Sequence, residues 1–174
     1  MEAEQRRRQA QQAIADREAA KARAVRIRFL EGLVKEERSR LRRRYSGRYW
    51  TVSDAINHFT TAGSAFDSAR FTMENPPIFD KVPWPTLLPP WELKEEQVNW
   101  EQVESFFKKA YARMPTQDYK ELVEKAHKRF HPDRWRARQF WKTIGDQEWV
   151  EKLDTVANKV SQAVSPIWIE SRNM

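Results

Sequence analysis

The sequence lacks cysteine altogether and has only four glycines among its 174 residues. The absence of cysteine excludes disulfide bonds and zinc sites built from thiolates. No run of about 18 apolar residues occurs, which is what a membrane-spanning helix would need. The N-terminal sequence MEAEQRRRQAQQ also lacks the apolar segment of a secretory signal. We therefore expect an intracellular protein that does not enter a membrane.

Positive charge is concentrated in the first part of the chain. Residues 1–50 hold 15 Lys and Arg against 7 Asp and Glu, a net charge of +8. Residues 51–174 hold 17 against 18, a net charge of −1. A partner attracted by positive charge should therefore meet residues 1–50.

Residues 2–44 contain no proline and one glycine, Gly32, and are rich in good helix formers. We expect one long helix, or two helices broken near Gly32. Its first half has almost no large apolar residue and should be solvated. Its second half carries an apolar stripe that should pack on this domain or on a partner: Ile27, Leu30, Val34 and Leu41. Two arginine clusters either bind nucleic acid or protein, serve as a nuclear address, or form a solvated face: Arg6, Arg7, Arg8, Arg40, Arg42, Arg43 and Arg44.

Short connecting helices are expected over residues 51–74. Gly47 should end the first helix, and the nearby aromatic residues should anchor that helix to the domain: Tyr45, Tyr49 and Trp50. Ser53 is a good N-cap, so a short helix should start there, and Gly63-Ser64 should break or bend it. Phe66 and Phe71 should face inward.

Residues 75–98 form a Pro/Trp-rich segment, with six of the nine prolines between 75 and 91. Proline favours an extended chain, whereas the many apolar residues argue against a disordered linker. We interpret the segment as an ordered strap across the helices. The alternative is a proline-rich ligand for an aromatic groove on another protein.

Three longer helices are expected in residues 99–174. Asn99 should cap a helix that runs to about Arg113, with Trp100 on its inner face. Thr116 should cap a helix over 117–130. Asp146 should cap a helix over 147–164, and Ser165-Pro166 should interrupt it. The fold class is therefore all-α: a long basic N-terminal helix followed by a compact helical domain with a proline-rich strap.

The tripeptide His131-Pro132-Asp133 lies between the last two of these helices. Proline cannot continue a helix and restricts the residue before it, so the preceding helix must end at His131. The turn is either a contact surface or a simple helix stop. In the second case His131 would cap the helix end and Asp133 would accept hydrogen bonds from backbone N–H groups.

Two antiparallel helices joined by His-Pro-Asp resemble helices II and III of a J-domain, the module of Hsp70 co-chaperones. The apolar positions of those helices fall on residues of matching type: Tyr119, Leu122, Val123, Ala126 and Phe130, then Leu153, Val156, Val160 and Ala163. The Asp-Pro that commonly follows helix III falls on Ser165-Pro166. The resemblance covers about residues 117–167.

The resemblance implies a non-enzymatic protein whose His131, Pro132 and Asp133 engage an Hsp70-type chaperone. Lys125, Lys128 and Arg129 would face an acidic surface of that partner. However, the short first helix of a J-domain is missing, Glu121 and Glu124 dilute the basic face, and the loop after the tripeptide is long and aromatic. These features resemble the NF-kappa-B-inhibitor-like protein 1 group and uncharacterised fungal relatives, as do Val82-Pro83-Trp84-Pro85 and the run Phe130 to Trp135.

Other chemistry has little support in the residues. His127 and His131 share a helix face, but no third or fourth metal ligand accompanies them, so neither a metal nor another cofactor is expected. No nucleophile or Gly-rich phosphate loop stands with His131 and Asp133, so an enzyme and a small-molecule substrate are not expected either. His58 should be structural. The alternative hypothesis is a scaffold subunit of a nuclear complex, such as a ribonucleoprotein, whose basic arm binds protein or RNA. The expected location is nuclear or cytoplasmic, and this hypothesis favours the nucleus.

Overall fold

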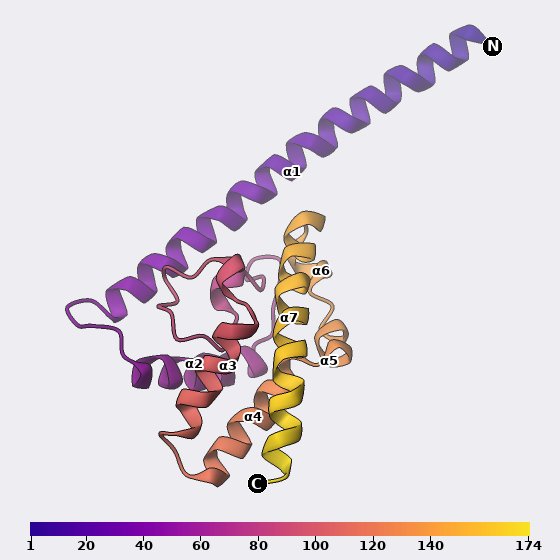
Figure 1. Ribbon diagram of the computed structural model, residues 1–174. Coiled ribbons are helices and arrows are strands. Elements are labelled where there is room, and N and C mark those ends of the chain that lie inside the picture. Colours follow the sequence, from indigo (N-terminus) through magenta and orange to yellow (C-terminus); the bar gives the residue numbers. More distant parts are fainter.

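The computed structural model describes all 174 residues, of which 74% are helical and none is in a strand. A long N-terminal helix precedes a compact helical domain (Figure 1), which confirms the predicted fold class. The elements are α1 (Glu2–Arg44), α2 (Val52–Ser68), η1 (Phe79–Lys81), η2 (Glu95–Gln97), α3 (Trp100–Tyr111), α4 (Thr116–Phe130), α5 (Pro132–Ala137), α6 (Trp141–Ile144) and α7 (Gln147–Arg172). No helix is long and apolar enough to cross a bilayer.

Helix α1 is a single helix that does not break at Gly32, where the space around the backbone is open. Residues 2–25 are exposed, and the N-terminal part of the helix extends past the rest of the molecule (Figure 1). The apolar stripe then meets the domain, with Leu30 and Leu41 buried and Ile27 and Val34 half-buried. The prediction that the second half would pack is therefore confirmed, and its target is this chain's own domain.

The turn after α1 holds an aromatic cluster. Tyr45 stacks on Trp91 with ring centroids 5.7 Å apart and meets Trp50 edge-on at 4.9 Å. Tyr49 was expected to help anchor the arm, but its side chain is 94% exposed. The anchor therefore joins the end of α1 to the strap through two of the three predicted residues.

Helix α2 is longer than the sequence suggested. Its N-cap is Thr51, which exchanges hydrogen bonds with Asp54 in a capping box, so the expected cap at Ser53 is wrong. The helix also runs through Gly63-Ser64 to Ser68. Gly63 has a packing role instead of a helix-breaking one, because a Cβ there would lie 2.5 Å from the guanidinium of Arg129.

The segment 75–98, here called the strap, packs against the core of the fold. Ile78, Val82 and Trp84 are buried and belong to the same apolar core as the helices. The Trp84 ring stacks on Phe130 of α4 at 5.6 Å, and its indole N–H donates to the carbonyl of Phe79 at 2.9 Å. The strap is thus ordered against its own domain, and its apolar residues are not displayed as a ligand for another protein.

Helices α4 and α7 pack side by side in opposite directions and form the hairpin at the centre of the fold (Figure 1). All five predicted apolar residues of α4 are buried: Tyr119, Leu122, Val123, Ala126 and Phe130. The predicted stripe of α7 is buried as well. Asn99 and Asp146 cap α3 and α7 as expected, each accepting a backbone N–H from three residues on.

Three expectations for the helices are wrong in detail. Trp100 is 45% exposed and donates to Glu104 on the surface of α3. The N-cap of α4 is Pro115, and Thr116 is already helical. Helix α7 continues through Pro166 to Arg172. A proline removes only one helical hydrogen bond, that to residue 162, and residue 162 is exposed so that its carbonyl can be hydrated.

Candidate functional site

The corner His131-Pro132-Asp133 connects α4 to α5 with no intervening loop. His131 is at once the C-cap of α4 and the N-cap of α5, and Pro132 is the first residue of α5. Proline suits that first position because its missing N–H would have no helical partner there. The ring Nδ1 of His131 accepts the backbone N–H of Asp133 at 3.2 Å. The sequence prediction of a stiff turn that ends α4 is confirmed, and a helix starts directly from it.

Trp135 anchors the corner to the interior of the fold. Its side chain is buried, and its indole N–H donates to the carboxylate of Asp154 on α7 at 2.9 Å. The ring stacks against Phe130 at 5.9 Å and packs edge-on against Phe140 at 4.9 Å. The corner is therefore attached to both helices of the hairpin, so its two polar side chains have little freedom to move with the backbone.

The two polar side chains of the corner differ in how they are used. Because Nδ1 of His131 accepts a hydrogen bond, the neutral imidazole carries its proton on Nε2, and Nε2 has no partner within the chain. The carboxylate of Asp133 is exposed and makes neither a hydrogen bond nor an ion pair. His131 thus has the capping role expected of a helix stop, while Asp133 has no structural contact.

The three basic residues expected beside the corner occupy different environments. Lys125 is exposed and has no ion pair. Lys128 pairs with Glu124 at 3.1 Å. Arg129 is not on the basic face: it is buried, and its guanidinium donates twice to Asp67 of α2 at 2.7 and 2.9 Å. Its Nη1 has no partner. Of these three residues, only Lys125 has an unpaired charge. The prediction that Arg129 would face a partner is wrong, because its side chain is buried in an ion pair.

His127 lies one turn before the corner and packs on the C-terminal part of α7. Its ring stacks on Trp168 with centroids 4.0 Å apart and planes 2° apart. Burial lowers the pKa of His127, the nearby His131 lowers it further, and Glu124 opposes the shift. The Trp168 indole in turn donates to Glu124. His127 is therefore part of a packed contact, and no group of three His, Asp or Glu residues could hold a metal ion.

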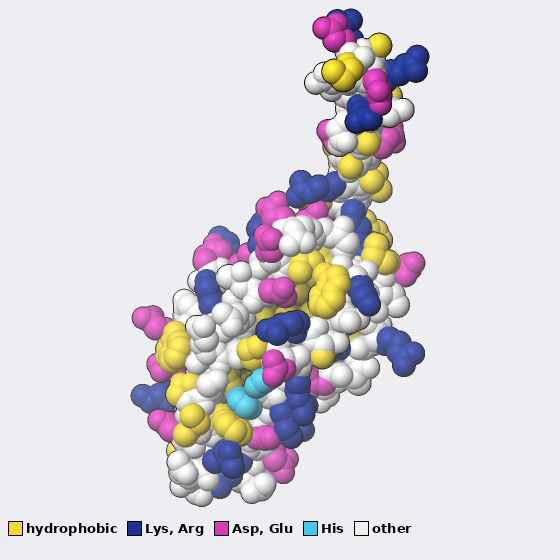
Figure 2. Space-filling view, turned by 90° about the vertical axis from the view of Figure 1, so that its right-hand side faces the viewer, with side chains coloured by type: hydrophobic (Ala, Val, Ile, Leu, Met, Phe, Trp, Pro, Cys, Tyr) yellow, Lys and Arg dark blue, Asp and Glu magenta, His cyan; other side chains and the backbone are white.

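A groove of about 240 Å³ opens next to the corner, between α5, α6 and α7. Pro132, Arg136 and the half-exposed Trp141 line it together with Asp154 and others. Figure 2 shows the face that carries α5, α6 and α7, where histidine side chains come to the surface beside acidic and basic groups and an apolar patch. Sequence reasoning noted the aromatic loop but missed this groove, because its lining combines residues 130–141 with Asp154 and Asn158 of α7, which only the tertiary structure brings together.

The arginines of α1 divide into inward and outward groups. Arg6, Arg7 and Arg8 are exposed on the projecting part, where Arg8 pairs with Glu4. At the other end Arg40 pairs with Glu37, and Arg44 lies over the Tyr45 ring. Arg42 and Arg43 are exposed and unpaired.

The arginines that dock α1 on the domain were not among the predicted site residues. Arg26 donates to the backbone carbonyls of Met73, Thr143 and Ile144, while Arg23 and Arg38 form ion pairs with the domain. Part of the positive charge of α1 is therefore used to hold the helix against the domain. The apolar stripe, with Arg23, Arg26 and Arg38 at three- to four-residue offsets from it, was the only signal that could have identified them.

No family model, curated protein or solved structure matches this chain.

Proposed function

We propose that this protein is a non-enzymatic, J-domain-like partner of an Hsp70-type chaperone, engaged through the corner His131-Pro132-Asp133. The observation that carries the proposal is the exposed, unpaired carboxylate of Asp133 on a turn whose backbone is held by both helices of the hairpin. A rigid display of a polar group with no structural contact is typical of a recognition surface.

The antiparallel hairpin of α4 and α7 supports the same proposal, since the resemblance to J-domain helices II and III requires that arrangement. The positive charge near the corner is smaller than the sequence predicted. Of the three predicted basic residues, Arg129 is buried and Lys128 pairs with Glu124, so only Lys125 keeps an unpaired charge. Arg134 and Arg136 of α5 are also exposed and form no ion pair. Contact with an acidic partner surface would then depend on fewer of the predicted charges, which favours a weak association with only a modest dependence on salt.

Single-turnover ATP hydrolysis by a purified Hsp70 tests the proposal. The wild-type protein should stimulate hydrolysis, and His131→Gln and Asp133→Asn should each abolish the stimulation. Glu101→Gln, an exposed change on α3 far along the chain from the corner, is the matched control and should stimulate like the wild type. Thermal unfolding of each variant separates loss of contact from loss of fold. Equal, absent stimulation by wild type and His131→Gln would remove the proposal.

A second candidate is a scaffold subunit of a nuclear complex that binds RNA through the arm. The observation in its favour is that Arg42 and Arg43 are exposed and unpaired at the end of a helix whose residues 2–22 make no contact with the domain through a hydrogen bond or an ion pair. Residues 2–22 hold five basic against four acidic residues, so phosphate contacts would concentrate near Arg42 and Arg43. Truncating α1 is a poor test, because Leu30 and Leu41 belong to the buried interior.

Binding of the full chain to a fluorescent single-stranded RNA 20-mer provides a better test. The affinity should fall steeply with salt, since each phosphate contact contributes about −0.7 to the slope of log K against log salt. Arg42→Gln with Arg43→Gln should weaken binding and flatten that slope, whereas Arg6→Gln with Arg7→Gln should have less effect. Salt-independent binding would contradict the second candidate.

A further inference from the structure

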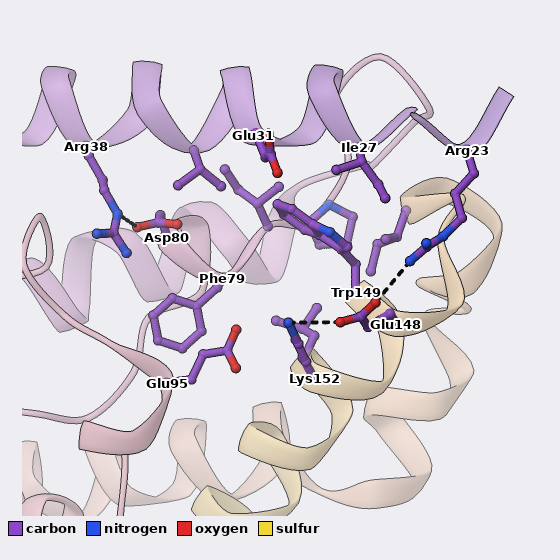
Figure 3. Close-up of a pocket in the computed structure, with 15 residues that line it drawn as sticks. Arg23, Ile27, Glu31, Arg38, Phe79, Asp80, Glu95, Glu148, Trp149 and Lys152 are labelled. Atoms are coloured by element: carbon purple, nitrogen blue, oxygen red, sulfur yellow. Dashed lines mark hydrogen bonds and ion pairs between the residues drawn. The ribbon is translucent and has the colours of Figure 1, made fainter. Parts of the chain in front are cut away.

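A cleft of about 440 Å³ separates one face of α1 from the strap and the first turns of α7 (Figure 3). Ion pairs close both of its ends: Arg23 meets Asp146 at 2.8 Å, and Arg38 meets Asp80 at 2.6 Å. The two arginines are 15 residues apart, which is about 22 Å along a helix. Helix α1 is thus attached to the domain at two points, and between them a space remains that the chain does not fill.

The walls of this cleft are apolar and only partly covered. Ile27 and Val34 of α1 form one wall, and Phe79 of the strap and Trp149 of α7 form the other. All four are half-buried. The volume lies within the range of about 300–1,000 Å³ that is usual for ligand sites. Covering this exposed apolar surface with an apolar side chain would lower the free energy of the complex.

The charges around the cleft are balanced except at two positions. The three cations are all paired: Arg23 with Asp146 and Glu148, Arg38 with Asp80, and Lys152 with Glu148 at 3.3 Å. Glu31 and Glu95 also line the cleft, and neither makes a hydrogen bond or an ion pair. Figure 3 shows Glu31 on the α1 side of the cleft and Glu95 on the opposite side, below Phe79. Two unpaired negative charges therefore flank apolar walls.

We propose that the cleft binds a short segment of a partner protein in which a lysine or arginine stands between apolar residues. The cation lies between Glu31 and Glu95, where charge-assisted hydrogen bonds are stronger than neutral ones. The neighbouring apolar side chains cover Phe79 and Ile27, and the face of Trp149 adds a cation–π contact. A nucleic acid or an acidic segment fits poorly, because its charges would face two uncompensated carboxylates.

This binding site is independent of the proposed chaperone contact. It is built from α1, the strap, η2 and the start of α7, and it shares no residue with the corner. The cleft lies between two ion pairs and admits a narrow chain, whereas docking of a folded domain usually buries about 800 Å² on each partner. A linear segment is therefore the occupant that matches both its size and its charge.

Fluorescence anisotropy with labelled heptapeptides tests the inference on the full chain. The probe GSLRLSG should bind, and the acidic probe GSLELSG should bind at least about 10-fold more weakly because its charge is repelled. The pair Glu31→Gln with Glu95→Gln should weaken the basic probe by at least about 10-fold, the loss expected when one charge-assisted contact is removed. The matched control, Glu36→Gln with Glu96→Gln, changes exposed glutamates of the same elements and should leave affinity unchanged.

Reversing both charges in the cleft should reverse the peptide preference. Glu31→Lys with Glu95→Lys should exchange the preference, so that GSLELSG binds more tightly than GSLRLSG, and the milder glutamine pair stands in if the reversed protein unfolds. His131→Gln should leave peptide affinity unchanged, which separates this site from the chaperone contact. No binding of GSLRLSG to the wild type at 1 mM, equal binding of both peptides, or equal effects of the control and cleft pairs would each overturn the inference.

Discussion

The arm helix α1 and the hairpin of α4 and α7 are held in one fold by different forces. Each hairpin helix buries a continuous apolar stripe. Helix α1, although 43 residues long, fully buries only Leu30 and Leu41, and its other attachments are arginines such as Arg26 and Arg38. Apolar packing contributes most of the stability and is insensitive to salt, whereas ion pairs fix position and are screened. We therefore expect the hairpin to open last and α1 to detach first.

This difference also assigns separate tasks to the two regions. The rigid hairpin can display a corner of fixed geometry, as recognition by a few side chains requires. The arm is held by directional contacts that leave a cleft beneath it. Its projecting part keeps its helix through local propensity, which suffices only because the helix is far longer than the 12–15 residues at which isolated helices are marginal.

Truncating one large apolar residue in each region should give the largest contrast. Phe130→Ala, in the hairpin, should lower the free energy of unfolding by about 3–5 kcal/mol because the ring is fully buried and its loss leaves a cavity. Ile14→Ala, on the projecting arm, should change it by less than about 0.5 kcal/mol, since the side chain is 61% exposed. Urea denaturation measures both. Similar losses would show that something covers the arm in solution.

The ion pair between α4 and α2 should be the next most sensitive position. Asp67→Asn leaves the buried guanidinium of Arg129, which already has an unpartnered Nη1, without its carboxylate. We expect a loss of about 2 kcal/mol, below the value for a fully buried pair because the Asp67 side chain is 42% exposed and water can partly replace it.

The double variant Asp67→Asn with Arg129→Met is the control for that prediction. It removes the buried charge as well as its partner, so it should recover part of the lost stability. Urea denaturation of the single and double variants gives the coupling energy. Wild-type stability of Asp67→Asn alone would show that this pair contributes to the position of α2 and not to its stability.

Acid should weaken the arm's aromatic anchor through His58. Burial first, then Arg44 and Arg40, lower the pKa of His58 from 6.5 to about 4, while Glu37 opposes the shift. Because the folded pKa is below the unfolded one, the unfolded chain binds the extra proton between these values. The contribution of His58 to stability is therefore present above pH 6.5 and is lost as the pH falls toward 4, by about 2 kcal/mol at pH 5.

His58→Phe tests this dependence, since it removes the titration while keeping an aromatic ring beside Tyr45. Urea denaturation at pH 7 and pH 5 should show a smaller loss for the variant than for the wild type. The difference should grow as the pH falls within this window. An identical loss in both proteins would mean that carboxylates and not His58 control the acid response.

Much of the fold follows from local patterns in the sequence. Apolar residues at helical spacing identified the buried faces of α4 and α7, and Asn99 and Asp146 identified two helix starts. The errors occurred where tertiary contacts override local preference. Gly63 predicts a helix break, yet it lies inside α2, where the absence of a side chain leaves room for the guanidinium of Arg129. Pro166 predicts a helix stop, yet α7 continues, because only one hydrogen bond is lost and the exposed carbonyl of residue 162 can be hydrated.

The site was predictable only where its residues are adjacent in the chain. The corner could be identified because proline fixes it locally. The burial of Arg129 could not, because its partner Asp67 lies 62 residues away and charged residues usually stay exposed. The cleft was also invisible to the sequence, since its glutamates belong to α1 and η2, which only the tertiary structure brings together.

The smallest effect on stability should come from the corner itself, and this sets the corner apart from the hairpin that carries it. Asp133→Asn should change the free energy of unfolding by less than about 0.5 kcal/mol, because the carboxylate is exposed and bonds to nothing, while the backbone N–H of residue 133 still donates to His131. Denaturation and Hsp70 stimulation should be measured on the same samples. Lost stimulation at unchanged stability makes Asp133 a contact residue. A loss of stability above about 1 kcal/mol would instead make the carboxylate part of the helix start, and the corner would be a structural turn.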